Sequence, residues 1–131
     1  MKRTIDSSHV LAVFMLLVAI HSILVGICLI VSPVSFLEKL GFFMEEKFFA
    51  AQGGVFHIVV SIAYLMAATN RPEKKAFVIF SFSAKFIATL FLFAYYLFVS
   101  PVLLVLLSGI GDLIMGIVIF VLFRLVWKRV Q

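Results

Sequence analysis

Four long stretches of the chain consist almost entirely of apolar residues. They cover about 9–31, 49–68, 76–98 and 102–127. Each is close to the roughly 20 residues that a helix needs to cross the hydrocarbon core of a bilayer. Backbone N–H and C=O groups cannot stay unpaired in lipid, so we expect all four stretches to be α-helices. The pattern predicts an all-α fold, in which residues 1–131 form one transmembrane four-helix bundle.

The segment 32–47 is the only substantial connection between these stretches. Pro33 follows the first stretch and should end its helix. Three apolar residues then share one side of a short helical turn: Phe36, Leu37 and Leu40. Gly41 is placed to close that turn. We expect a small interfacial helix here, acting as a folded connector rather than as a functional lid.

The other two connections are short. Asn70-Arg71-Pro72 is a turn signal between the second and third stretches. Ser100-Pro101 separates the third stretch from the fourth, so these two helices should form an antiparallel hairpin.

Composition agrees with a membrane protein. Of the 131 residues, 65% are hydrophobic, and the mean hydropathy is +1.27. A soluble domain of this size has too little interior to bury so much apolar surface. Cys28 is the single cysteine, which excludes an intramolecular disulfide framework. The net charge of +5 does not indicate nucleic acid as a partner, because the basic residues flank the apolar stretches.

The basic residues are distributed unequally between the two ends of the predicted bundle. Eight lie at the end that holds both termini: Lys2, Arg3, Arg71, Lys74, Lys75, Arg124, Lys128 and Arg129. Only Lys39 and Lys47 lie at the other end. The positive-inside rule therefore predicts a multi-pass protein of the cell membrane with both termini in the cytoplasm. We expect Met1-Lys2-Arg3 to precede an uncleaved first span rather than a signal peptide, and Trp127 to anchor the cytoplasmic interface.

Four ionisable side chains lie inside the spans: His21, His57, Lys85 and Asp112. A charged group at mid-membrane costs at least about 2.5 kcal/mol, so such groups usually face the bundle interior and carry a role. From the helical rise, His57, His21 and Asp112 lie about 12 to 16 Å from the outer ends of their spans. Lys85 lies about 23 Å from the outer end of its span, roughly one turn closer to the cytoplasmic end than Asp112.

The partner of Asp112 is left open by the sequence. Side chains lean towards the N-terminus of their own helix, which would move Lys85 and Asp112 apart. Asp112 then pairs either with Lys85 or with His57 or His21. The alternative for Lys85 is to extend to the cytoplasmic headgroups.

Small and hydroxyl residues share helical faces with these ionisable groups. On the second stretch they are Gly54, Ser61, Tyr64 and Ala68; on the third, Ser81, Thr89 and Tyr96; on the fourth, Ser108 and Gly116. Close helix packing in lipid needs the same residue types, so packing alone is the competing explanation. We predict a ligand-binding site with these members: Asp112, His57, His21, Lys85, Tyr64 and Ser61.

Catalytic and metal sites are not indicated. The two histidines with Asp112 have no diagnostic metal-ligand spacing. Gln52-Gly53-Gly54 lacks the lysine and the preceding strand of a phosphate-binding loop. No nucleophile–base pair is legible, so an intramembrane enzyme is the least favoured class.

Several short segments resemble the DoxX-like small membrane proteins, a broad bacterial set of four-helix bundles, over almost the whole chain. They are Gly26, Ser32-Pro33 and Phe36, Gly53-Gly54-Val55-Phe56-His57, Tyr64-Leu65, Lys85, and Asp112-Leu113-Ile114-Met115-Gly116. Gln52 stands where such families often have an arginine. The resemblance implies the four-helix fold, and for some relatives a redox-protein partner in the membrane or an association with quinone.

Two functions follow as hypotheses. In the first, the protein is a non-enzymatic accessory subunit or a binder of a small amphipathic ligand, a quinone or a lipid, in a polar pocket inside the bundle. In the second, it is an ion- or proton-coupled transporter that works as a homo-oligomer and titrates Asp112 and the histidines.

Overall fold

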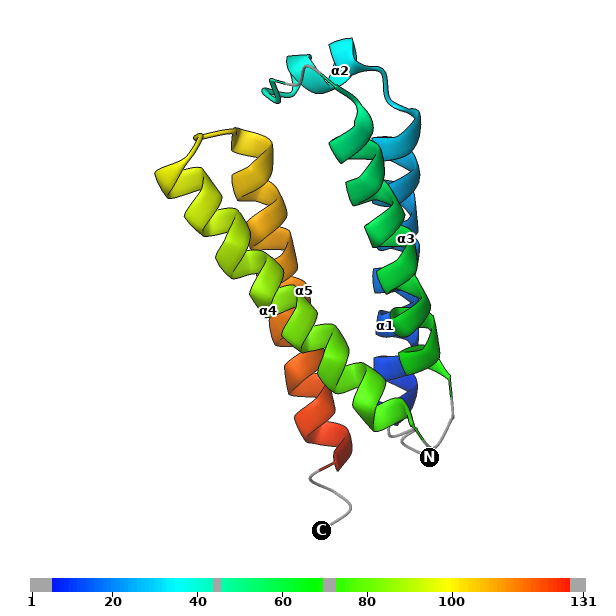
Figure 1. The fold of residues 1–131 in the computed structure, drawn as a ribbon. Helices are drawn as coiled ribbons and strands as arrows, with labels where there is room; N and C mark the ends of the chain where they lie inside the picture. The colour runs from blue at the N-terminus through cyan, green and yellow to red at the C-terminus, as the bar shows by residue number, and fades with distance from the viewer. Residues whose placement is uncertain (1–5, 44–45, 70–72, 128–131) are drawn as a thin grey trace.

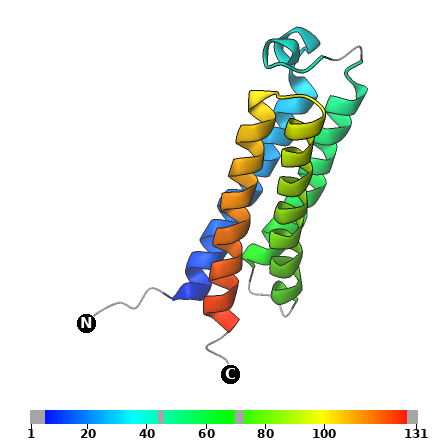
Figure 2. The same cartoon turned by 90° about the vertical axis from the view of Figure 1, so that its left-hand side faces the viewer.

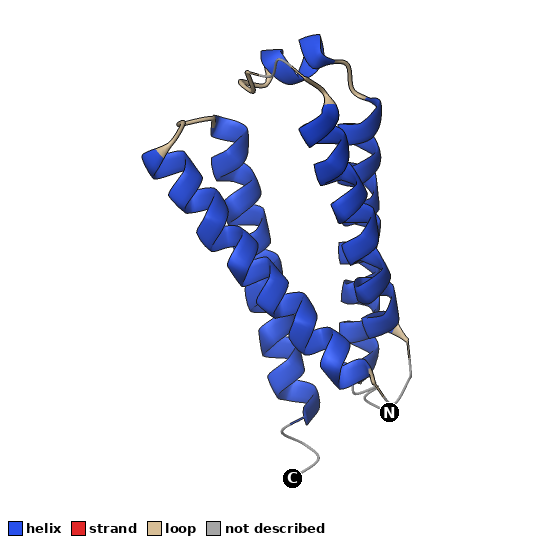
Figure 3. Cartoon of the chain, in the orientation of Figure 1, coloured by secondary structure: helices blue, strands red, loops and turns tan. Residues whose placement is uncertain are grey.

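The computed structural model describes residues 6–43, 46–69 and 73–127. Its helices are α1 (Ser7–Val31), α2 (Val34–Lys39), α3 (Phe48–Ala68), α4 (Lys74–Phe98) and α5 (Leu103–Trp127). All described regular structure is helical (Figure 3). Four of the helices are long and apolar enough to cross a membrane. The predicted all-α four-helix architecture is confirmed, and the helix boundaries lie within two residues of those expected from the sequence.

Several sequence features lie outside the described residues. They are Met1-Lys2-Arg3, Glu45, Asn70-Arg71-Pro72, Lys128 and Arg129.

The ends of α1 follow from local chemistry. The Asp6 side chain accepts a hydrogen bond from the Ser8 backbone N–H at 3.1 Å, so it caps the helix and starts it before the apolar run. At the other end Ser32 is the C-cap, and Pro33 directly after it is the N-cap of α2.

The short helix predicted between the first two spans is α2. Gly41 closes it at φ 94°, a conformation that a side chain would strain. The Gly41 N–H donates to the Glu38 carbonyl, and the Phe42 N–H donates to the Leu37 carbonyl, which is a Schellman cap. The expected shared apolar side is only partly right: Leu37 is buried, whereas Phe36 and Leu40 are exposed. In a helix shorter than two turns, only the residue that faces the bundle is covered.

The long helices form two antiparallel pairs, α1 with α3 and α4 with α5, and contact within each pair is more extensive than contact between the pairs. The two pairs approach each other at the end of the bundle that holds both termini and diverge towards α2 (Figure 1). We call these the termini end and the α2 end. Figure 2 shows the bundle turned by 90°, with the α4/α5 pair in front of the α1/α3 pair.

The hydrophobic core lies at the termini end. Its buried members come from all four long helices: Leu11, Met15, Val18, Ala19, Tyr64, Ala67, Val78 and Ile119. Except for Ala19, which is the central residue of α1, each is in the half of its helix that is nearer to the termini. On α5, Phe123 stacks on Trp127 with ring centroids 4.8 Å apart, which continues the packing to the end of the bundle.

The α1/α3 pair is held together by a backbone contact between two glycines. A Cβ added to Gly26 would lie 2.6 Å from the Gly54 carbonyl oxygen, and one added to Gly54 would lie 2.5 Å from the Gly26 carbonyl oxygen. Glycine is required at both positions because the two backbones touch.

Candidate functional site

A cleft of about 330 Å³ lies between the two helix pairs. Its polar lining consists of Ser22, His57, Tyr64, Lys85 and Asp112, and most of the remaining wall is apolar, including Leu29, Phe56 and Val60. Apart from Tyr64, which belongs to both, these residues lie on the α2 side of the hydrophobic core along their helices. The cleft therefore lies near the middle of the long helices. Figure 1 shows that the two helix pairs diverge towards α2.

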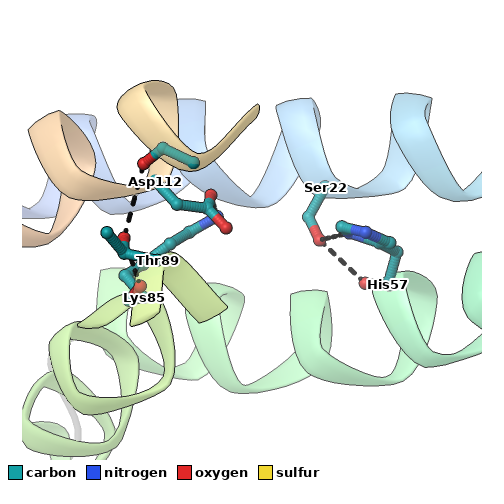
Figure 4. Close-up of polar contacts among 6 residues, drawn as sticks. Ser22, His57, Lys85, Thr89 and Asp112 are labelled. Atoms are coloured by element: carbon teal, nitrogen blue, oxygen red, sulfur yellow. Dashed lines mark hydrogen bonds and ion pairs between the residues drawn. The ribbon is translucent and has the colours of Figure 1, made fainter. Parts of the chain in front are cut away.

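Lys85 on α4 and Asp112 on α5 form an ion pair beside this cleft. The Lys85 Nζ donates to Asp112 Oδ1 at 2.5 Å, and the two side chains are 5% and 15% exposed. This confirms the expectation that Asp112 faces the interior and contacts a polar group of another helix. Of the open alternatives, Lys85 is the partner, and it does not extend to the headgroups (Figure 4).

Small residues on α5 bring the two helices close enough for this pair. A Cβ on Gly116 would lie 3.3 Å from the Lys85 Cβ, and one on Gly109 would lie 2.6 Å from the Phe93 ring. The Thr89 hydroxyl donates to the Lys85 carbonyl at 2.9 Å and lies 3.5 Å from the Gly109 carbonyl oxygen. Lys85 is thus level with Gly116, one turn from Asp112, as the helical rise predicts. The long Lys85 side chain extends over that turn towards the α2 end. This is opposite to the usual direction, because helical side chains lean towards the N-terminus of their own helix.

Tyr64 on α3 connects the ion pair to the other helix pair. The Lys85 Nζ lies 5.6 Å from the centre of the Tyr64 ring, within the range of a cation–π interaction. Tyr64 is 3% exposed and also belongs to the hydrophobic core. It therefore forms the floor of the cleft towards the termini end.

Ser22 on α1 makes two contacts with His57 on α3. The Ser22 hydroxyl donates to the His57 backbone carbonyl at 2.9 Å, and its oxygen lies 3.2 Å from His57 Nδ1 (Figure 4). A hydroxyl has one proton, so the second contact requires Nδ1–H to donate to the Ser22 oxygen. In the neutral ring this assignment leaves Nε2 as a hydrogen-bond acceptor.

Two of the predicted site residues do not line the cleft. His21 lies exposed on the bundle surface, although it is next to Ser22. Ser61 is buried, and its hydroxyl donates to the Ile58 carbonyl of its own helix at 2.6 Å. Equal depth along the helices was a poor guide here, because neighbours in a helix differ by about 100° in direction.

The face predicted for α5 also needs a correction. Ser108 is exposed, and the buried residue of that turn is Gly109. Tyr96 is half-buried but lies outside the cleft lining.

Ser22 is the site residue that sequence reasoning missed. Val18, Ser22 and Gly26 are buried and follow each other at intervals of four on α1. Small residues at intervals of four indicate a helix face that packs closely against another helix, so Ser22 could have been predicted from the sequence. The ionisable neighbour His21 was predicted in its place.

The cleft is bordered by residues of α3 and α4 that are at least partly exposed. On α3 it is bordered by Phe56, which is 59% exposed, and on α4 by Ala84 and Ala88, which are half-buried. Small side chains on one rim leave lateral space beside the ion pair. In a membrane this part of the two helices would lie at the level of the hydrocarbon region, because it is midway along both.

Within 6–43, 46–69 and 73–127, no three His, Cys, Asp or Glu side chains gather in a group that could hold a metal ion. No protein-family model matches this chain, and no curated protein or solved structure is significantly similar to it.

Proposed function

We propose that this multi-pass protein binds a small amphipathic ligand, a quinone or a lipid, in the cleft between its two helix pairs, without catalysing a reaction. The ligand places a polar head at Lys85, Asp112 and His57, and its apolar body lies against Phe56, Val60 and the surrounding lipid. Few polar groups in an otherwise apolar wall are the usual form of a small-molecule site.

One observation carries this proposal: the Lys85–Asp112 ion pair lies beside open volume rather than inside a closed helix interface. A pair that served only to join α4 and α5 would be surrounded by packed side chains, as the buried polar groups of membrane bundles usually are. Here the pair, Tyr64 and His57 surround the same cleft, which a ligand can enter sideways from the bilayer.

The cellular setting belongs to the same proposal. The protein lies in the cell membrane with both termini in the cytoplasm, as the distribution of basic residues predicts. Membership of the DoxX-like proteins, with a membrane redox protein or a second copy as partner, is compatible with the four-helix bundle but stays a proposal.

The test compares the ligands that co-purify with the wild type, Asp112→Asn and Ser108→Ala. Ser108 is the matched control, because it lies one turn from Asp112 on α5 but is exposed and outside the cleft. Bound lipids and quinones are extracted and quantified by mass spectrometry. We expect one species to be enriched in the wild type and in Ser108→Ala, and to fall about tenfold in Asp112→Asn, since a hydrogen bond to a charged group contributes about 1.5–3 kcal/mol.

The rival account is that the polar groups only hold helices together, at about 1 kcal/mol or less for each contact. Equal amounts of the same ligands in all three proteins, with a change in thermal stability alone, would establish that account and reject the binding function.

A further inference from the structure

The ion pair has hydrogen-bonding capacity that its own contact does not use. Lysine has three N–H donors, and among the described residues the Lys85 ammonium gives one of them to Asp112 Oδ1. A carboxylate has two acceptor oxygens, and among those residues Oδ1 is the one that Lys85 occupies. Both side chains line the cleft, so a donor and an acceptor stand side by side at its wall.

His57 adds a second acceptor to the same cleft. Its Nδ1 is engaged by Ser22, so in the neutral ring the other nitrogen, Nε2, is an acceptor, and His57 is one of the residues that line the cleft. The cleft therefore presents the remaining N–H donors of Lys85 together with acceptors on Asp112 and His57.

Charge decides which polar head fits these groups. The charges of Lys85 and Asp112 compensate each other at 2.5 Å. A ligand that carried a full charge would enter a low-dielectric site where its counter-ion is already paired, and it would have to break that pair to be neutralised. A neutral head with one donor and one acceptor meets the available groups without disturbing the pair.

We infer that the cleft selects a neutral, hydroxyl-bearing head on a single apolar chain or ring, in preference to a carboxylate, phosphate or ammonium head. The head accepts a hydrogen bond from Lys85 and donates one to Asp112 or His57. This inference rests on the binding function proposed above and narrows its ligand: a quinol or a neutral lipid alcohol carries such a head, whereas an oxidised quinone has no hydrogen-bond donor.

The size of the cleft supports a single chain. Its volume of about 330 Å³ is near the lower end of the roughly 300–1,000 Å³ that small-molecule pockets occupy. The cleft encloses a head group and the first part of a body, and the rest extends through the opening between Phe56 and Ala88 into the lipid.

The experiment measures saturable binding of three amphiphiles of equal chain length to the full chain in nanodiscs: hexadecanol, hexadecanoate and hexadecylamine. At pH 8 the acid and the amine carry opposite charges and the alcohol carries none. Radiolabelled hexadecanol is competed by each charged amphiphile, and empty nanodiscs correct for partition into lipid. We expect the wild type to bind hexadecanol at least about tenfold more tightly than either charged amphiphile, a difference of about 1.4 kcal/mol.

Two variants test the role of the ion pair. Lys85→Met leaves the carboxylate alone and should move the preference towards hexadecylamine, whereas Asp112→Asn leaves the ammonium alone and should move it towards hexadecanoate. Ser108→Ala should rank the three as the wild type does. If either charge variant fails to fold, the wild-type ranking alone decides.

Tighter binding of a charged amphiphile than of hexadecanol by the wild type would overturn the neutral-head inference and leave the binding function intact. An absence of saturable binding for all three amphiphiles would count against both.

Discussion

Lys85 on α4 and Asp112 on α5 form an ion pair across one helical turn. The glycines of α5 allow the two helices to approach closely enough for the long lysine side chain to reach the carboxylate. Each charge is neutralised by the other, and Lys85 also faces the Tyr64 ring. The pair is well covered by protein, so its two members depend on each other much more than an exposed pair would. This dependence can be measured.

We expect Asp112→Leu and Lys85→Met each to lower the free energy of unfolding by about 3–5 kcal/mol, because each leaves a buried group of the opposite charge unpaired. The double variant Lys85→Met/Asp112→Leu should recover most of that loss, since it leaves no charge at the site. Unfolding is followed by circular dichroism during titration with sodium dodecyl sulfate.

Lys75→Met is the control for the loss of a positive charge, because Lys75 is exposed at the start of α4. It should change stability by less than about 0.5 kcal/mol. Additive losses in the double variant would mean that the two side chains do not interact in the membrane.

At the scale of the helices, the two pairs are joined internally by different means. The α1/α3 pair relies on the backbone contact between Gly26 and Gly54. The α4/α5 pair relies on glycines that pack against the Phe86 and Phe93 rings, on Thr89 and on the ion pair. Each pair is therefore a unit with its own packing, and the cleft is the space that remains between two such units.

The glycine contact supplies a matched test within a single dipeptide. Gly54→Ala would place its Cβ 2.5 Å from the Gly26 carbonyl oxygen, whereas a Cβ on Gly53 would meet nothing within 4 Å. We expect Gly54→Ala to destabilise the protein by about 1–3 kcal/mol, because a backbone neighbour cannot rotate away. Gly53→Ala should be neutral or stabilise the helix by up to about 1 kcal/mol.

Thermal unfolding of the two variants in one detergent makes the comparison. If both shift the Tm by the same amount and in the same direction, the close approach of α1 and α3 does not exist as described.

At the scale of the whole molecule, the bundle is packed at one end and divided at the other. The core residues from all four long helices lie at the termini end, and the cleft lies where the helix pairs separate (Figure 1). At the α2 end, the turn at Gly41 approaches the Val102 side chain, so the connecting segment contacts the start of α5.

Orientation is the prediction that belongs to this scale. Glu46 and Glu73 are exposed and lie at opposite ends of the bundle. In a Cys28→Ser background, Glu46→Cys should react with a membrane-impermeant thiol reagent on intact cells. Glu73→Cys should react only after the cells are opened, because eight basic residues mark its end as cytoplasmic.

Labelling of position 73 but not of position 46 on intact cells would reverse the orientation. The Cys28→Ser parent, labelled in parallel, gives the background.

The sequence by itself determined the class and the helices of this protein. Apolar stretches of membrane-spanning length leave the backbone no alternative to a helix, and the turn at Ser100-Pro101 is short enough to make α4 and α5 antiparallel. It also showed that Asp112 would face inward, since a carboxylate turned towards lipid is too costly.

The tertiary structure decided which of the inward residues meet. Depth along a helix follows from counting residues, but the direction of each side chain and the distance between helices depend on how the surfaces pack. Gly109 and Gly116 set the approach that joins Lys85 to Asp112, and the rotation of α1 brought Ser22 rather than His21 to the site. The cleft itself exists because the two helix pairs pack tightly within themselves and meet mainly at the termini end, a property of all four surfaces together.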